Sequence, residues 1–234
     1  LAELSVPLVS FTFGCPSPED IARVKQSTGE VWVTVTTVDE ARQAEDAGAD
    51  CLVVQGSEAG GHRGGFTDDH GGLGLLALVQ LVRASTAAPL IATGGIMTGA
   101  GLAAVLAAGS RAGALGTAFL RCPEAGTSAV HQEALEKHGR PTALTRAFTG
   151  RLARGIRNRF LDEHTAAAPV AYPEVHNLTA PLRAHGRSIG DPDVVNLWAG
   201  QAYALASDRP ARDIVHQVAT EARTALDHAR HVLG

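Results

Sequence analysis

Short runs of apolar, mostly β-branched residues alternate with helix-like segments through the first half of the chain. The runs are PLVSFTF (Pro7–Phe13), VWVTVT (Val31–Thr36), CLVVQ (Cys51–Gln55), LIAT (Leu90–Thr93) and AGALG (Ala112–Gly116). Their apolar character is continuous, which is typical of parallel strands covered on both faces. The pattern therefore predicts an α/β fold built on a parallel sheet.

The segments between the runs carry helix start signals. Ser17 followed by Pro18 predicts an N-cap and a first helical turn, and Asp39 and Thr98 predict two further caps. A fourth helix is predicted over Leu73–Arg83. Strands and helices that alternate through short loops favour right-handed βα units.

Two fold classes accommodate five βα units: an open doubly wound sheet, and a TIM (β/α)8 barrel that needs eight strands. The chain begins at Leu1, and its one methionine is Met97. We therefore expect about three further βα units upstream. The preferred fold is a barrel of which strands four to eight are present.

The pattern changes after residue 126. We expect residues 1–126 to form the partial barrel and residues 127–234 to form a helical C-terminal extension packed on it within the same domain. The predicted helices of the extension are Ser128–His138, Val194–Ala206 and Pro210–Leu233, and the prolines at 169, 173 and 181 predict a loop between the first two.

Composition excludes several classes of protein. The chain has 234 residues, a net charge of −4 and 45% hydrophobic residues, which is ordinary globular composition. No apolar run is long enough for a membrane span, and mild acidity argues against nucleic acid as a partner. Three cysteines in no paired motif, and ten histidines without ligand spacing, predict no disulfide and no metal site. The reducing cytoplasm is the expected compartment.

Six arginines and no acidic residue occupy the stretch from Arg140 to Phe160. The stretch lacks the interleaved aromatic residues of a nucleic-acid surface. We interpret it as a solvated or salt-bridged face, with one or two arginines within reach of an anionic ligand.

The densest chemical signal is the loop QGSEAGGHRGG, from Gln55 to Gly65, directly after the third strand. Ligands in parallel α/β folds bind beyond the carboxyl ends of strands. Five glycines in the loop permit close approach of backbone N–H groups to a ligand, and His62 can exchange a proton near neutral pH. The plainer interpretation is a surface loop with a solvated histidine.

Glycines also end the next two strands. Gly94 and Gly95 follow one strand and precede the helix that Thr98 caps, and Gly116 and Thr117 end the following strand. Glycine-rich strand ends before a helix N-terminus bind phosphate, as in many barrels after their last two strands. A tight βα turn is the alternative reason for each glycine.

Taken together, these motifs resemble the nitronate monooxygenases, formerly called 2-nitropropane dioxygenases, in their bacterial form. The resemblance covers essentially the whole chain, without the family's N-terminal third and its Pro-Met-Ala-Gly segment. It is carried by VSFTFGCPSPED, VQGSEAGGHRGG, IATGGIMTG and GALGTAFL, and by TRAFTGRLARGIRNRF, TAPLR and NLWAGQAY toward the C-terminus.

The resemblance implies an FMN-dependent oxidoreductase that oxidises alkyl nitronates, with propionate 3-nitronate as one candidate, by molecular oxygen. It implies that His62 is catalytic, as a base toward a neutral nitroalkane or as a partner of the anionic nitronate. The implied FMN contacts are Gln55, Gly60, Gly61, Gly94, Gly95, Ala114, Leu115, Gly116 and Thr117. Partners would be the small-molecule substrate and O2, with a homo-oligomer also open.

Two alternatives stay open. One is an NAD(P)H-dependent flavin reductase of the same superfamily, such as an enoyl-acyl-carrier-protein reductase II or a quinone reductase. The other is a non-catalytic fragment.

Overall fold

The structure is a computed structural model, and it describes residues 6–27, 29–69 and 72–234. The chain divides into two compact units, each assembled from several segments. The first unit comprises Leu1–Ser57, Arg63–Gly94 and Leu102–Ala114, and the second comprises Glu58–His62, Gly95–Gly101 and Leu115–Gly234.

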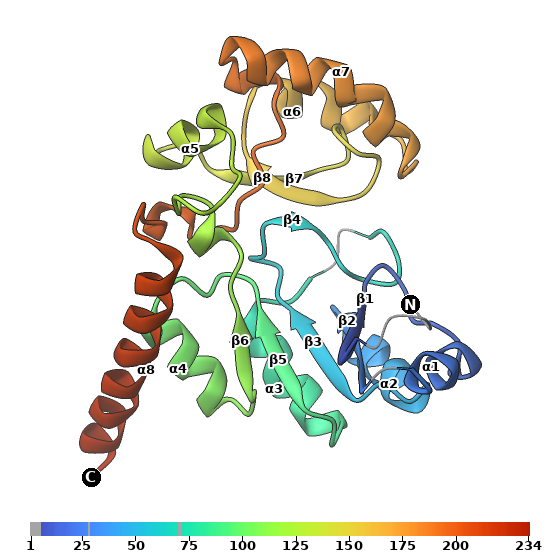
Figure 1. The fold of residues 1–234 in the computed structure, drawn as a ribbon, viewed down its shortest axis with the longest axis vertical. Helices are drawn as coiled ribbons and strands as arrows, with labels where there is room; N and C mark the ends of the chain where they lie inside the picture. Colours follow the sequence, from blue (N-terminus) through green and yellow to red (C-terminus); the bar gives the residue numbers. More distant parts are fainter. Residues whose placement is uncertain (1–5, 28, 70–71) are drawn as a thin grey trace. The chain divides into compact units, whose positions relative to one another are not determined.

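A parallel five-stranded sheet forms the first unit (Figure 1). Its strands are β1 (Leu8–Phe11), β2 (Glu30–Val35), β3 (Cys51–Gln55), β5 (Leu90–Thr93) and β6 (Ala112–Ala114). All five predicted strands are confirmed. Each strand pairs with the strand of this sheet that follows it along the chain, in the order β1-β2-β3-β5-β6, and β4 belongs to the other sheet. A doubly wound sheet would reverse this order at a switch point, so the order belongs to the barrel class.

Helices connect the strands of this sheet, and three of the four predicted helix starts are confirmed in place or nearly so. The helices are α1 (Pro18–Lys25), α2 (Val38–Asp46), α3 (Leu75–Ser85) and α4 (Gly99–Ala107). The Ser17 hydroxyl accepts the Asp20 N–H at 3.1 Å, and the Thr98 hydroxyl accepts the Gly101 N–H at 3.2 Å.

The predicted cap at Asp39 is wrong. The Thr37 hydroxyl caps α2 by accepting the Glu40 N–H at 3.1 Å. Asp39 lies inside the first turn, where a carboxylate interacts favourably with the N-terminal end of the helix dipole.

Aliphatic side chains of the strands and of α3 make the core of the first unit. Val31, Val33 and Val35 alternate along β2, and their side chains are fully buried. Leu78, Val79 and Val82 of α3 are also fully buried, and α3 packs against β3 and β5. The apolar strand pattern thus reports burial in the sheet.

Antiparallel strands and helices form the second unit. The three-stranded sheet has the order β4-β8-β7, from β4 (Gly61–His62), β8 (Ala153–Ile156) and β7 (Thr142–Thr145). The helices are α5 (Ala129–Glu136), α6 (Arg159–His164), α7 (Glu174–Ile189) and α8 (Ala211–Leu233). Of these, α5 and α8 confirm predictions, whereas β7, β8 and α6 were not predicted, so the region after residue 126 is not purely helical.

The predicted helix over Val194–Ala206 is wrong. Short 3₁₀ turns occupy Pro192–Val194 and Tyr203–Leu205, and the chain between them is extended beside β8. The Ile156 N–H donates to the Leu197 carbonyl at 2.8 Å, and Leu197 and Ala199 are buried. Strand-like pairing with β8 therefore prevails over helix formation in this segment.

The loop predicted around the three prolines is also wrong in part, because α7 begins at Glu174 and contains Pro181. Pro181 lacks the N–H that would bond the Asn177 carbonyl. Both residues are exposed, so water can satisfy that carbonyl.

Candidate active-site residues

Three adjacent strands of the first unit end at predicted site residues. Gln55 of β3 is in register with Thr93 of β5, and Thr93 is in register with Ala114 of β6. The Thr93 hydroxyl donates to the Ala114 carbonyl at 3.0 Å. The carboxyl ends that carry Gln55, Gly94 and Ala114 therefore lie side by side, as expected for parallel strands.

The loop after β3 is tied down by its own residues. The side-chain oxygen Oε1 of Gln55 accepts the Gly64 N–H at 2.9 Å, and buried Arg63 donates from Nη1 to the Gly56 carbonyl at 2.6 Å. A Cβ on Gly64 would lie 2.6 Å from Thr34 Cγ2, and one on Gly65 2.6 Å from Thr36 Oγ1. These two glycines are therefore required for packing against β2 and the residue that follows it.

Two predicted cofactor contacts of the second unit share a neighbour, Gly200. A Cβ on Gly60 would overlap the Gly200 nitrogen and the Ala199 backbone. The Gly200 N–H donates to the Thr117 hydroxyl at 3.0 Å. Gly60 thus has a packing reason of its own, and Gly200 brings it close to Thr117.

His62 lies on the two-residue edge strand β4 of the second unit. It is paired antiparallel with Ala153 of β8, and its side chain is half-buried. The imidazole centroid is 5.5 Å from the ring of Tyr172 and 5.8 Å from that of Trp198. Its Nε2 lies 2.9 Å from the Thr149 hydroxyl oxygen. His62 is thus fixed by named contacts, which contradicts the alternative of a solvated loop histidine.

The side chains around His62 were missed by the sequence analysis. Thr149, Tyr172 and Trp198 lie about 90 to 140 positions after His62, and no local pattern links them to it. The signal that could have found Thr149 and Trp198 is their presence in the C-terminal runs that carry the family resemblance.

The glycines after the strands have the backbone geometry of a phosphate loop. Gly94 has φ +106° and Gly95 has φ +72°, a region that favours glycine. A Cβ on Gly95 would lie 3.0 Å from Glu58 Cβ, whereas one on Gly116 would meet no described atom within 4 Å. Consecutive glycine N–H groups and open space suit a phosphate, so these residues fit the phosphate of FMN.

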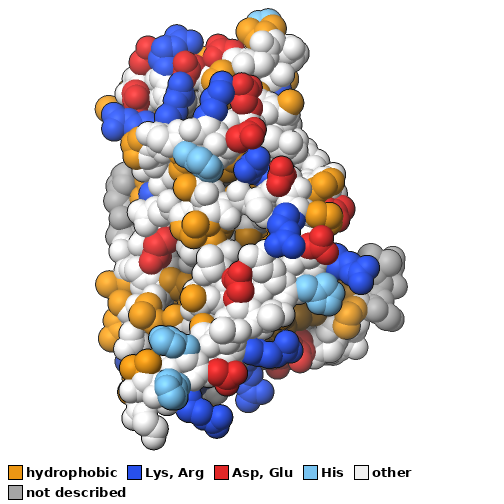
Figure 2. Space-filling view, turned by 90° about the vertical axis from the view of Figure 1, so that its left-hand side faces the viewer, with side chains coloured by type: hydrophobic (Ala, Val, Ile, Leu, Met, Phe, Trp, Pro, Cys, Tyr) orange, Lys and Arg blue, Asp and Glu red, His pale blue; other side chains and the backbone are white. Residues whose placement is uncertain are grey.

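The arginine-rich stretch is partly a salt-bridged face, as interpreted from the sequence. Arg140 pairs with Asp193 at 2.9 Å, and Arg157 pairs with Asp162. Arg154 of β8 is buried and donates to the Thr142 hydroxyl at 3.2 Å. Burial lowers the Arg154 pKa, and the Glu58 carboxylate acts against that shift. Figure 2 shows acidic and basic side chains interspersed on the face that it presents.

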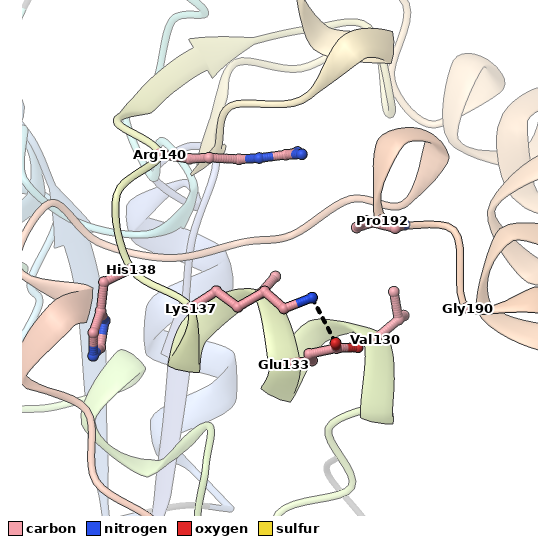
Figure 3. A pocket seen from close by; sticks show the side chains of 8 residues that line it. Val130, Glu133, Lys137, His138, Arg140, Gly190 and Pro192 are labelled. Atoms are coloured by element: carbon pink, nitrogen blue, oxygen red, sulfur yellow. Dashed lines mark ion pairs between the residues drawn. The ribbon is translucent and has the colours of Figure 1, made fainter.

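A separate pocket of about 210 Å³ lies on the second unit beside α5 (Figure 3). The Lys137 ammonium is paired with Glu133 across 2.6 Å, the dashed line of the figure. None of the predicted site residues lines this pocket. Its lining residues are Val130, Glu133, Ala134, Lys137, His138, Arg140, Gly190 and Pro192.

Within residues 6–27, 29–69 and 72–234, no group of three His, Cys, Asp or Glu side chains could hold a metal ion. No helix in the same described ranges is both long and apolar enough to span a bilayer.

The unreversed parallel strands, with glycine-rich loops at their carboxyl ends, define an α/β chain of the TIM-barrel class. The model of the nitronate monooxygenase family matches residues 1–221. This chain belongs to that family.

Individual relatives agree. A nitronate monooxygenase of Pseudomonas aeruginosa is 43% identical over 222 residues, 92% of this chain and 63% of the relative. A probable nitronate monooxygenase of Staphylococcus aureus is 37% identical over 95% of this chain and 64% of its own length. The chain therefore spans somewhat less than two thirds of the curated relatives that it matches.

Solved structures of related proteins share the fold of this chain. A nitroalkane oxidase from Streptomyces ansochromogenes matches with a TM-score of 0.90 and 47% identity, over 97% of this chain and 66% of that one. FabK from Thermotoga maritima matches with a TM-score of 0.81 and 28% identity, over 97% of this chain and 71% of that one.

Proposed function

We propose that the protein to which this chain belongs is an FMN-dependent nitronate monooxygenase, which oxidises alkyl nitronates with molecular oxygen. The observation that carries the proposal is His62, which Thr149, Tyr172 and Trp198 hold in a chain of this family. Propionate 3-nitronate is one candidate substrate.

Each residue has a distinct role in the proposed reaction. The backbone N–H groups of Gly94, Gly95 and Gly116 would bind the phosphate of FMN, which supplies the electron transfer to oxygen. His62 would take the α-proton of a neutral nitroalkane, or balance the charge of a nitronate that arrives as an anion. A positioned base contributes about 10² to 10⁴ in rate.

The direct test is oxygen consumption by the purified protein to which this chain belongs, supplemented with FMN, with nitroethane or its nitronate and without pyridine nucleotide. Uptake on the nitronate is the expected result. Turnover that requires NAD(P)H would favour the reductase alternative. Absence of both flavin binding and turnover would favour the non-catalytic fragment.

Substituting His62 separates the chemistry from cofactor binding. We expect His62→Asn to lower turnover of neutral nitroethane by about 10² or more while bound FMN stays unchanged, because the base is lost and the phosphate contacts are not. Equal nitroethane turnover in variant and parent would refute the base assignment.

A glycine variant tests the phosphate contacts without disturbing packing. A Cβ on Gly116 or on Gly126 meets no described atom within 4 Å. We expect Gly116→Val to raise the Kd for FMN at least tenfold, because the side chain would enter the space of the phosphate, and Gly126→Val to leave it unchanged. Fluorescence titration with FMN measures both, and equal affinities in the two variants would remove Gly116 from the FMN contacts.

The cytoplasm is the proposed compartment. Cys15, Cys51 and Cys122 form no disulfide, and burial raises the pKa of the Cys51 thiol to about 11, which makes it inert. That the protein forms a homo-oligomer also stays a prediction.

A further inference from the structure

The hydroxyl of Thr149 makes contacts whose donors and acceptors can be assigned one by one. Thr149 lies in the turn that joins β7 to β8, and its side chain is buried at 1% exposure. Its Oγ1 is 3.1 Å from the Arg151 carbonyl oxygen and 2.9 Å from His62 Nε2. The Arg151 N–H approaches the same oxygen at 3.5 Å.

Proton counting determines the direction of each bond. A threonine hydroxyl has one proton to donate, and a carbonyl oxygen can only accept. When both contacts are hydrogen bonds, the Thr149 proton goes to the Arg151 carbonyl, and Oγ1 is left with lone pairs toward His62. His62 Nε2 must then carry a hydrogen and donate it to Thr149. In a neutral imidazole a protonated Nε2 leaves the lone pair on Nδ1.

We propose that Thr149 is a positioning residue that holds neutral His62 as its Nε2–H tautomer and so makes Nδ1 the basic atom of the site. The proposal deepens the proposed function, on which its catalytic part rests. In the reaction, Nδ1 takes the α-proton of the nitroalkane, and the C–H electron pair stays on the substrate as the nitronate. His62 becomes an imidazolium whose Nε2–H still donates to Thr149, so the bond is kept throughout the transfer.

The surroundings of Thr149 fix the backbone of the turn that carries its hydroxyl. Its backbone N–H donates to the Arg146 carbonyl at 3.1 Å, which fixes the turn. The next residue, Gly150, has φ +80° and packs against Ala171. A hydroxyl that donated to His62 instead would give up its hydrogen bond to the Arg151 carbonyl.

The tautomer can be measured without substrate or activity. In ¹⁵N-histidine-labelled protein, the two ring nitrogens of a neutral imidazole have well separated shifts, and the His62 signal is identified by its loss in His62→Gln. We expect Nε2 to have the protonated shift and Nδ1 the unprotonated one. A protonated Nδ1 in the parent protein overturns the proposal, whatever the enzyme does with nitronates.

Two variants then test the role of the hydroxyl. Thr149→Val keeps the shape of the side chain and removes the hydroxyl, whereas Thr149→Ser keeps the hydroxyl. We expect Thr149→Val to mix the His62 tautomers and to lower turnover of neutral nitroethane by about tenfold or more, with little change on preformed nitronate, and Thr149→Ser to restore both. Equal losses on the two substrates, or an unchanged tautomer in Thr149→Val, would overturn the role assigned to Thr149. A parent protein with the expected tautomer but no turnover would refute the proposed function alone.

Discussion

The surroundings of His62 depend on a glycine that bears no functional group. Gly150 combines φ +80° with backbone contact to Ala171, whose N–H donates to the Gly150 carbonyl at 3.0 Å. The next residue is Tyr172, which packs on His62 edge to face. Gly150 therefore determines where one of the two aromatic rings beside the histidine can lie.

Gly150→Ala is expected to destabilise the protein by about 2–4 kcal/mol, because the methyl group would overlap the Ala171 carbonyl and the backbone would be strained. Gly190→Ala is the matched control. Its φ is +72°, but a Cβ there meets no described atom within 4 Å, so only the backbone strain of about 1 kcal/mol is expected. Urea denaturation measures both, and equal losses would mean that the Ala171 contact carries no energy.

Among single residues, the sequence alone was enough to find His62 and the glycines of the candidate site. Their position at strand ends and the clustering of the glycines are local signals. It did not find Thr149, Tyr172 or Trp198, because antiparallel pairing of Gly61–His62 with β8 is a long-range contact without local periodicity. It also assigned Gly60 and Gly64 to ligand approach, whereas the structure gives both a packing reason.

Among the elements of the second unit, α8 is in contact with the segment Gly95–Gly101. The Glu221 carboxylate accepts the Gly99 N–H at 3.0 Å, and hydrogen bonds from Gln217 and then Gly99 lower its pKa. A Cβ on Gly99 would overlap Glu221 Cβ and the Ala222 nitrogen. α8 therefore approaches the backbone at residue 99 closely only because that residue is glycine.

Two glycines of the same helix give a matched pair for this contact. We expect Gly99→Ala to destabilise the protein by about 1–3 kcal/mol, since α8 must shift, and Gly101→Ala to be neutral or stabilising by up to about 1 kcal/mol. A Cβ on Gly101 meets its nearest atom, Thr98 Oγ1, at 3.7 Å. Thermal unfolding of both variants measures the difference, and a neutral Gly99→Ala would contradict tight docking.

The strands of the first unit were predictable because each has its own apolar run, and the starts of α1 and α4 were predictable because Ser17 and Thr98 cap them. In the second unit the local signals conflicted with the structure. The prolines at 173 and 181 indicated a loop where α7 forms, and Val194–Ala206 had helical composition but pairs with β8. Exposure of Pro181 and burial of Leu197 decided these cases, and neither is visible in the local pattern.

For the whole molecule, acid stability is expected to depend on His131 of α5. Burial lowers the pKa of His131 to about 4, with Arg187 contributing and a hydrogen bond to the Trp198 backbone opposing the shift. Within the described part of the chain, its buried Nε2 has no hydrogen-bond partner. The folded protein therefore holds His131 neutral in a pH range where the unfolded chain protonates it.

The sign of the pH dependence follows from that lowered pKa. The contribution of neutral His131 to the free energy of unfolding is fully present above about pH 6.5, the ordinary pKa of histidine. It is lost as the pH falls to about 4, and the total loss is on the order of 3 kcal/mol. Urea denaturation at pH 7 and pH 4.5 should show a smaller difference in His131→Leu than in the parent. His185→Leu, at an exposed position of α7, should retain the parental difference. If His131→Leu lost as much stability between pH 7 and pH 4.5 as the parent protein, the loss in acid would come from other groups.

The division of the chain into two units also affects how relatives can be recombined. The chain passes from one unit to the other at five points, after residues 57, 62, 94, 101 and 114. A single crossover near residue 115 would therefore exchange most of the second unit but leave its His62 segment with the other parent. Such a chimera would combine a histidine from one lineage with the threonine and the aromatic rings of another. Gene shuffling within this family should thus yield active progeny mainly when three crossovers, after residues 57, 62 and 114, transfer residues 58–62 together with residues 115–234.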